Sequence, residues 1–446
     1  MSKFQYVIKR NGAKVPFTTQ RITNAIYRAS VATGGRDKNF AKKLAEKAVA
    51  KLENKFPASY VPHIEEIQDV VEEVLIEAGE SELAKAYIIY RAENMKRRQQ
   101  QSRRYSYEDN VPWEKIWRTL VWAQKHDLDS IDKLNKRIRK GEMPDIIKES
   151  EQFYQKQIDF ASQLILDKSD EIKMVMVSGP SSSGKTTTTI KLEKILRKQG
   201  FKFVPLNVDN YFFDLDMHPK DEFGDYDFET PQALDLELIN KHINQLLQGR
   251  EVKIPFYDFS KGKRTLNKTP LQLKKKEILI IDSLHGLNPQ FAADSPEESK
   301  FKLYLEPLLQ MRDKQDKFIR WTDIRMMRRM LRDAKFRAYK PAQTLEHWHY
   351  VRASEMRHII PNAMSADFII NSAMPYELSF YKYYLINDFK KWTKQYKDDP
   401  LREDALMRAT RVYSFLKDIQ KCEQEDLIPK DSVIREFLGG SELKYH

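Results

Sequence analysis

One segment, residues 172–199, constrains the fold more than any other part of this 446-residue chain. A short apolar run begins at Ile172 and ends at Gly179, and a helix-favouring sequence starts at Thr186. Between them lies G-P-S-S-S-G-K-T, which fits the pattern G-x-x-x-x-G-K-[ST] at every fixed position. A strand, a glycine-containing loop and a helix in this order predict a parallel α/β sheet with a phosphate-binding loop at its edge.

The residues of this loop suit the phosphates of a nucleoside triphosphate. Backbone N–H groups are expected to surround phosphate oxygens, and the helix N-terminus adds its positive dipole end. Lys185 is expected to neutralise the β- and γ-phosphates, and the Thr186 hydroxyl to join the shell of a Mg²⁺ ion. Asp282 ends the apolar run 278–281 and is the second predicted metal ligand. The predicted nucleotide-contacting residues are Gly179, Ser181, Ser182, Ser183, Gly184, Lys185, Thr186 and Thr187.

Phosphoryl transfer, unlike simple hydrolysis, needs a base beside an acceptor hydroxyl and cations over the transferring group. Asp209 follows the predicted strand 203–208 at the ligand-binding edge of a parallel sheet and is the predicted base. The alternative for Asp209 is a turn-forming carboxylate that caps the strand. A predicted helix from Thr322 carries arginines at helical spacing, which predict a solvated basic face or a phosphate clamp. These are Arg325, Arg328, Arg329 and Arg332, with Arg337 just beyond.

Composition narrows the classes of function. Lys and Arg total 77 against 65 Asp and Glu, so the net charge of +12 favours an anionic partner, of which nucleic acid is only one kind. The single cysteine, Cys422, excludes an internal disulfide framework. No apolar run reaches the length of a membrane span, and the N-terminus lacks the apolar core of a secretory signal. A cytoplasmic location is therefore expected, with no membrane partner.

Changes in hydrophobic periodicity and composition along the chain predict four segments. Residues 1–100 contain a small hairpin with its turn at Asn11-Gly12, followed by helices. Residues 101–171 form a helical connector, 172–388 form the α/β part, and 389–446 form a helical C-terminal extension. The run 96–104 is polar and basic, which is typical of a linker or a frayed helix end.

The α/β motifs together resemble the uridine kinase and phosphoribulokinase family of P-loop kinases, through five ordered blocks between about residues 173 and 370. The blocks are GPSSSGKTT, VDNYF, YDFETPQALD, IPFYDFSKGKR and TDIRMMRRMLRDAKFR. The resemblance implies a P-loop kinase that uses ATP and Mg²⁺ to phosphorylate a hydroxyl of a nucleoside, such as uridine or cytidine, or of a related sugar. It implies catalytic roles for Asp209, Lys185, Arg332 and Arg337, and substrate contacts for Phe212, Glu229, Tyr257, Phe259, Arg264 and Arg329.

Three positions depart from the pattern of this family. Gly262 stands where uridine kinases have a histidine that contacts the base, and it is expected to leave a void there. Asp282-Ser283 replaces Glu-Gly, and Arg337-Ala338 replaces Arg-Gly. The acceptor therefore stays open, with a phosphorylated sugar or a glycerate as the alternative to a nucleoside. A nucleotide-sensing regulator that contacts nucleic acid is an alternative of another class, although nucleic acid is otherwise not expected as a partner.

Residues 1–95 resemble an ATP-cone, the nucleotide-binding regulatory module of ribonucleotide reductases. The segment 7–29 is similar to the opening hairpin and first helix of that module, and 86–91 is similar to its closing block. The resemblance implies a small, mostly helical regulatory domain that binds ATP or dATP. A homo-oligomer is also expected, and the helical segment 101–170, the covalent route between the two modules, is expected to act through its interface. The residues implied at the regulatory nucleotide are Lys9, Arg10, Asn11 and Arg21.

Overall fold

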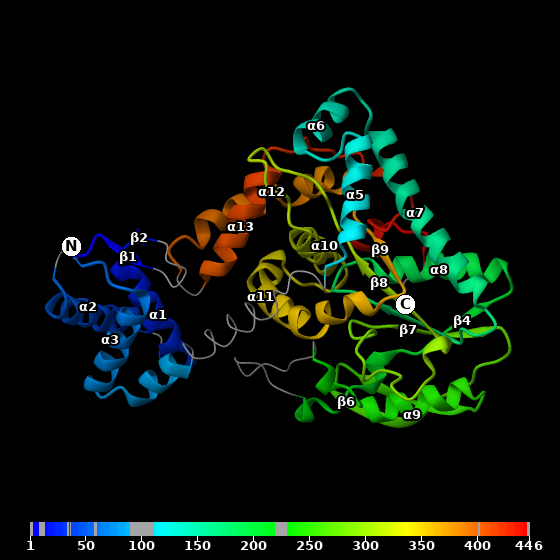
Figure 1. Cartoon of the computed structure of the whole chain (residues 1–446), viewed down its shortest axis with the longest axis horizontal. Coiled ribbons are helices and arrows are strands. Elements are labelled where there is room, and N and C mark those ends of the chain that lie inside the picture. Colours follow the sequence, from blue (N-terminus) through cyan, green and yellow to red (C-terminus); the bar gives the residue numbers. More distant parts are fainter. Residues whose placement is uncertain are drawn as a thin grey trace. The chain divides into compact units, whose positions relative to one another are not determined.

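The computed structural model describes residues 3–8, 14–33, 35, 37–57, 60–89, 111–218, 230–399 and 402–443. The chain divides into two compact units (Figure 1). We call Met1–Glu108 with Tyr396–Glu403 the N-terminal unit, and Asp109–Gln395 with Asp404–His446 the sheet unit.

The N-terminal unit is a small antiparallel strand pair followed by helices. Its elements are β1 (Tyr6–Ile8), β2 (Lys14–Pro16), α1 (Thr19–Ala32), α2 (Lys38–Lys55), α3 (Ile64–Glu77) and a helix that includes residues 81–89. Apolar residues at helical spacing meet in one core, where Ile26, Leu52 and Val70 are fully buried. The Asp37 carboxylate accepts two backbone N–H groups at the start of α2 and so caps that helix. The predicted hairpin and helices are therefore present, while the predicted turn at Asn11-Gly12 lies outside the described residues.

The sheet unit is built on five parallel strands in the order β4-β7-β3-β8-β9. Met176 of β3 pairs with Ile281 of β7 on one side and with Lys302 of β8 on the other, so the carboxyl ends of these strands meet at one edge. The predicted parallel α/β fold is confirmed. The strands are β3 (Met174–Ser178), β4 (Lys202–Pro205), β7 (Glu277–Asp282), β8 (Lys300–Glu306) and β9 (Phe368–Asn371).

Helices cover both faces of the sheet. On one face, Met174 and Met176 of β3 and Leu279 and Ile281 of β7 pack in a core with α9 (Leu236–Leu247) and the hairpin of β5 (Val252–Asp258) and β6 (Lys263–Leu271). The other face is covered by α8 (Lys185–Lys198), against which α7 (Met143–Asp167) packs in turn. The central strand β3 is apolar up to Ser178 and buried along its whole length, because both of its faces are covered.

The remaining helices of the sheet unit come from segments predicted as connector, kinase-like part and C-terminal extension. These helices lie in the sheet unit, whereas Tyr396–Glu403 of the predicted extension belongs to the N-terminal unit, and the predicted boundaries stay predictions. These helices are α5 (Trp113–Lys125), α6 (Ile131–Arg139), α10 (Trp321–Phe336), α11 (Pro341–His358), α12 (Glu377–Gln395), α13 (Glu403–Leu416) and α14 (Arg435–Leu438).

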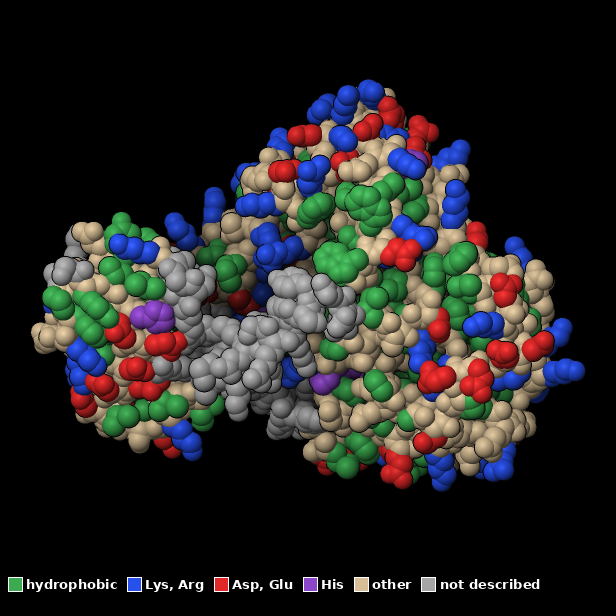
Figure 2. All heavy atoms as spheres, viewed as in Figure 1, with side chains coloured by type: hydrophobic (Ala, Val, Ile, Leu, Met, Phe, Trp, Pro, Cys, Tyr) green, Lys and Arg blue, Asp and Glu red, His purple; other side chains and the backbone are tan. Residues whose placement is uncertain are grey.

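Within the described ranges given above, every helix is too short or too polar to cross a bilayer. Acidic and basic side chains are interspersed on the face of the sheet unit shown in Figure 2.

Two elements differ from the prediction. The strand expected over 203–208 ends at Pro205, although the Leu206 N–H still donates to the Ile280 carbonyl of β7 at 2.9 Å, and Asp209 lies in a 3₁₀ helix (Val208–Tyr211) instead of at a strand end. The β5–β6 hairpin was not predicted as strands. In β6 the residues are mostly exposed and polar on both faces, so its sequence lacks the alternation that signals a half-buried strand.

The predicted arginine face of α10 is divided by the fold. Arg325 and Arg328 are fully buried, so they form neither a solvated face nor a clamp that is open to phosphate. Arg325 pairs with both carboxylate oxygens of Glu355, and Arg328 donates to both oxygens of Glu377 at 2.7 and 3.0 Å. Buried guanidinium groups need such paired carboxylates, because an isolated charge in the interior is strongly unfavourable.

The Arg328–Glu377 pair yields a stability prediction. Glu377→Gln leaves the Arg328 charge buried without its counter-ion, and we expect the free energy of unfolding to fall by about 3–5 kcal/mol. Chemical denaturation followed by tryptophan fluorescence measures this in the sheet unit alone. All six tryptophans lie in that unit; they are Trp113, Trp117, Trp122, Trp321, Trp348 and Trp392.

Glu114→Gln is the matched control, because it removes the same charge from an exposed pair with Arg118. Exposed pairs of this kind contribute little, so the control should unfold at nearly the denaturant concentration of the parent chain. Equal destabilisation by both substitutions would contradict the special importance of the buried pair.

Candidate functional site

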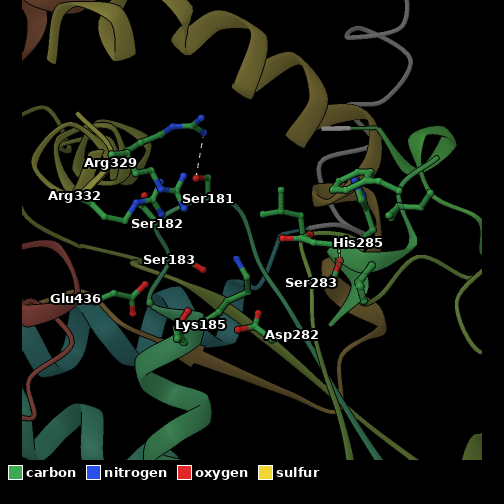
Figure 3. A pocket seen from close by; sticks show the side chains of 18 residues that line it. Ser181, Ser182, Ser183, Lys185, Asp282, Ser283, His285, Arg329, Arg332 and Glu436 are labelled. Carbon is green, nitrogen blue, oxygen red and sulfur yellow. Dashed lines mark hydrogen bonds between the residues drawn. The ribbon is translucent and has the colours of Figure 1, made fainter. Parts of the chain in front are cut away.

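A cavity of about 320 Å³ opens at the carboxyl edge of the sheet (Figure 3). The loop after β3, the 3₁₀ helix after β4, the end of β7, helix α10 and helix α14 all contribute to its wall. Its lining residues are Ser181, Ser182, Ser183, Gly184, Lys185, Thr186, Val208, Asp209, Phe212, Leu234, Asp282, Ser283, Leu284, His285, Arg329, Arg332, Arg337 and Glu436.

The loop between β3 and α8 can follow its path only with glycine at both fixed positions. Gly179 has φ +154°, and a Cβ atom there would lie 2.3 Å from the Leu305 carbonyl oxygen. Gly184 has φ +90°, and a Cβ atom there would lie 2.5 Å from Val433. These glycines let the loop backbone curl around the cavity at the start of α8, the arrangement that binds phosphate.

Lys185 supplies a cation at the floor of this loop. Its ammonium group donates to the carbonyl oxygens of Gly179 at 2.9 Å and Pro180 at 3.4 Å. Burial lowers the pKa of Lys185, while the carboxylates of Asp282 and Glu436 oppose this shift. The neighbouring carboxylates thus favour the charged ammonium that an anionic ligand requires.

The residues predicted to hold a metal fit a magnesium ion. Thr186 and Asp282 line the same cavity and offer a hydroxyl and a carboxylate oxygen, which are hard donors of the kind that Mg²⁺ prefers. Among the residues that the structure describes, no group of three His, Cys, Asp or Glu side chains could form a metal cage. The two donors therefore suit an ion that also uses phosphate oxygens and water.

Asp209 faces the cavity from the 3₁₀ helix after β4. The Asn207 side chain accepts its backbone N–H at 3.0 Å and fixes the turn. The surrounding protein raises the pKa of the Asp209 carboxyl group, and the Arg337 guanidinium partly offsets the shift. A carboxyl group of raised pKa beside the cavity can accept a proton from a ligand hydroxyl.

Three arginines of α10 and its C-terminus reach the opposite wall of the cavity. Arg329 donates to the Ser181 hydroxyl at 3.3 Å. Asp333, which is buried, lies 3.3 Å from Arg329, 2.9 Å from Arg332 and 3.7 Å from Arg337. One buried carboxylate therefore orders three guanidinium groups toward a site for anions.

The other predicted ligand contacts lie outside this wall. The N–H and hydroxyl of Thr187 donate to Glu436. Tyr257 is buried and packs on Phe212, while Phe259 is exposed. Arg264 pairs with Asp235 at 2.8 Å. Predicted residue Glu229 lies outside the described residues, as do Lys9, Arg10 and Asn11 of the N-terminal unit, where Arg21 is exposed.

No void exists beside Gly262, contrary to the expectation from its missing side chain. Gly262 has φ +62°, and a Cβ atom there would lie 2.8 Å from the Cβ of Leu215. The Gly262 carbonyl also accepts the Leu215 N–H at 2.9 Å. Leu215 fills the space, so glycine is required at this position and a histidine could not be accommodated.

Sequence reasoning missed three residues of the site. His285 lines the cavity three positions after Asp282, and Asp333 orders the arginines. Glu436 reaches the cavity from a segment 249 positions beyond Thr187. The interleaving of Asp333 with the arginines was a usable signal, but nothing in the local sequence around Glu436 indicates a contact with the loop.

Two family models match the chain. Residues 5–96 match the model "ATP cone domain", and residues 174–378 match "Phosphoribulokinase / Uridine kinase family". Both matches fall on the segments whose motifs predicted them.

The named proteins that match this chain share little sequence identity with it. A uridine kinase of Deinococcus deserti is 26% identical over 198 residues, which are 44% of this chain and 86% of that protein. A uridine kinase of Borrelia duttonii is 26% identical over 227 residues, covering 50% of this chain and 99% of that protein. The inorganic pyrophosphatase TTM2 of Arabidopsis thaliana is 33% identical over 132 residues, covering 29% of this chain and 17% of that protein.

The phosphate loop, the parallel sheet and the family matches agree on one assignment. The chain carries an N-terminal ATP cone domain and a P-loop kinase domain of the phosphoribulokinase and uridine kinase family.

Proposed function

We propose that this kinase uses ATP and Mg²⁺ to phosphorylate a hydroxyl group of a nucleoside, with uridine and cytidine as the leading candidates, or of a related sugar. The observation that carries the proposal is the composition of one cavity. It combines the phosphate loop, the Asp209 carboxylate and three guanidinium groups. Transfer of a phosphoryl group to a hydroxyl requires these three components.

Each component has a distinct chemical role. Asp209 orients the acceptor hydroxyl and takes its proton as the hydroxyl oxygen attacks. Lys185, Arg332 and Arg337 stabilise the negative charge on the transferring phosphoryl group. A magnesium ion held by Thr186 and Asp282 would supply further positive charge at the phosphates.

The acceptor is proposed to bind beside Phe212, which lines the cavity. Tyr257 and Phe259 pack edge-to-face with Phe212, at centroid distances of 5.6 and 6.1 Å. Aromatic walls of this kind suit a flat base. The Tyr257 hydroxyl behind Phe212 is buried and has no hydrogen-bond partner among the residues that the structure describes.

A phosphorylated sugar or glycerate is less well supported. Lys261 and Lys263, on either side of Gly262, could attract a phosphorylated acceptor, but Lys263 pairs with Asp214 and Lys261 with Asp258, which neutralises them. A nucleic-acid partner is also less well supported, because a nucleic-acid-binding surface is typically a basic patch. On the face of the sheet unit shown in Figure 2, charges of both signs are interspersed.

An acceptor panel tests the proposal. ADP release is measured with ATP, Mg²⁺ and each of uridine, cytidine, the purine nucleosides, phosphorylated sugars and glycerate. We expect turnover with a pyrimidine nucleoside or a related sugar. On that acceptor, Asp209→Asn should lower kcat by about 10²–10⁴, because the proton acceptor is lost while the shape is kept.

Measuring ATP binding as well as turnover distinguishes a loss of catalysis from a loss of ATP recognition. Asp209→Asn should bind ATP as the parent chain does, whereas Lys185→Ala should weaken both binding and turnover. Near-normal kcat in Asp209→Asn would show that another group is the base. Turnover only with phosphorylated metabolites would replace the nucleoside assignment by the alternative.

The pH dependence of kcat/KM gives a separate test. Asp209 must be ionised to act as a base, so activity is lost as the pH falls through its pKa. Because Arg337 lowers this pKa, Arg337→Gln should raise it and move the acidic limb of the profile to higher pH. Arg337→Lys keeps the charge and should leave the limb near its original position. An unmoved limb in Arg337→Gln would contradict the coupling.

We further propose that the ATP cone domain regulates the kinase without contributing to its chemistry. The loop, the candidate base, the metal ligands and the arginines all lie in the sheet unit, so catalysis needs no group from the N-terminal unit. Regulation requires that the bound nucleotide favours one functional state; a coupling of about 1–3 kcal/mol corresponds to roughly 5–150-fold changes in affinity.

Titration of the full chain with ATP and dATP tests the cone. In a Lys185→Ala background, which weakens the kinase site, we expect one remaining binding event. Replacing Lys9 and Arg10 by alanine should abolish it, because these cations are the implied phosphate contacts. Lys42→Ala, on the exposed face of α2, is the control. Persistence of the event in the Lys9 and Arg10 variant would refute the assigned site.

A further inference from the structure

The segment 428–439, beyond the kinase family match, is packed directly on the phosphate loop. Val433 fills the space that glycine leaves at position 184. Asp431 pairs with the buried Lys191 of α8 at 2.7 Å, and Ser432 bonds the buried Tyr376 hydroxyl at 3.0 Å. The ammonium group of Lys335 in α10 donates to the Leu438 carbonyl. These anchors hold the backbone of the segment beside the loop.

From this position Glu436 extends its carboxylate into the cavity (Figure 3). One oxygen, Oε2, accepts the backbone N–H of Thr187 at 3.1 Å and its hydroxyl at 2.7 Å. Both donors belong to the first turn of α8, where the helix dipole favours an anion. A carboxylate thus occupies donors of the type that a phosphate loop presents to a nucleotide.

Two other hydroxyl donors of the loop differ from that of Thr187, which is bound to Glu436. The hydroxyl groups of Ser182 and Ser183 are buried in the loop and have no hydrogen-bond partner within the described part of the chain. Lys185, Arg329 and Arg332 line the same cavity and provide positive charge for a larger anion than one carboxylate. The nucleotide phosphates and Glu436 carry the same sign of charge, so they repel each other when both lie at the loop.

We propose that Glu436 sets the nucleotide affinity of the kinase site, because its carboxylate competes with the nucleotide phosphates for the Thr187 donors. The side chain has three rotatable bonds, so it can swing aside while Val433 and Asp431 keep the segment in place. Nucleotide binding therefore includes the loss of two hydrogen bonds to a charged group. This inference rests on the proposed use of ATP at the loop.

Isothermal titration with ATP tests the competition in the full chain. The event that belongs to the kinase site is the one that Lys185→Ala weakens or removes. Glu436→Gln keeps the size of the side chain and removes its charge, and we expect its Kd for ATP at this site to fall about tenfold or more. ADP, with fewer phosphates, should show the same direction of change. Glu442→Gln removes an exposed carboxylate six positions further along the chain and is the matched control, with an unchanged Kd.

The outcomes separate the two proposals. Unchanged or weaker ATP binding in Glu436→Gln, with an intact thermal unfolding transition, would overturn the competition. If that variant unfolds, Glu436→Ala is measured in its place, with tighter binding expected for the same reason. Absence of any event that depends on Lys185, in the parent chain as well as the variants, would overturn ATP binding at the loop and this inference with it.

Discussion

The geometry of the site depends on guanidinium groups that are buried beneath it. Arg325 donates to the Ser181 carbonyl at 3.1 Å while both of its ends are held by Glu355. Arg328 pairs with Glu377 and donates to the Ser372 carbonyl at 2.7 Å. The Ser372 hydroxyl in turn donates to the Ser183 carbonyl. One helix thus fixes the backbone of the phosphate loop through two charged pairs.

The arginines of α10 have two different roles, depending on the side of the helix from which they extend. Arginines that point inward fix the loop, and arginines that point toward the cavity are ordered by Asp333. Because both sets are on one rigid helix, the cavity cations are held in register with the loop they face. Preorganised charges of this kind stabilise a developing negative charge without reorganisation during the reaction.

Features of the site could be predicted from the sequence where the interacting residues are close together along the chain, and not where they are far apart. The phosphate loop was predictable because its strand, turn and helix are contiguous. The burial of Arg325 and Arg328 was not, since their carboxylate partners lie 30 and 49 positions later. Helical spacing alone cannot distinguish a solvated arginine from one paired in the interior. The filled space at Gly262 was equally hidden, because Leu215 reaches it from another loop.

The packing of Val433 on Gly184 also has a consequence for how the chain is made. Asp431, which neutralises Lys191, is synthesised 240 residues after it. Until that stretch leaves the ribosome, the Lys191 ammonium group lacks its carboxylate partner and the loop lacks the surface against which it packs. The nascent sheet can form earlier from its own strands, but the nucleotide loop reaches its final shape only after residues 431–433 have been synthesised. Folding of the binding site is thereby tied to the synthesis of a segment about 240 residues further along the chain.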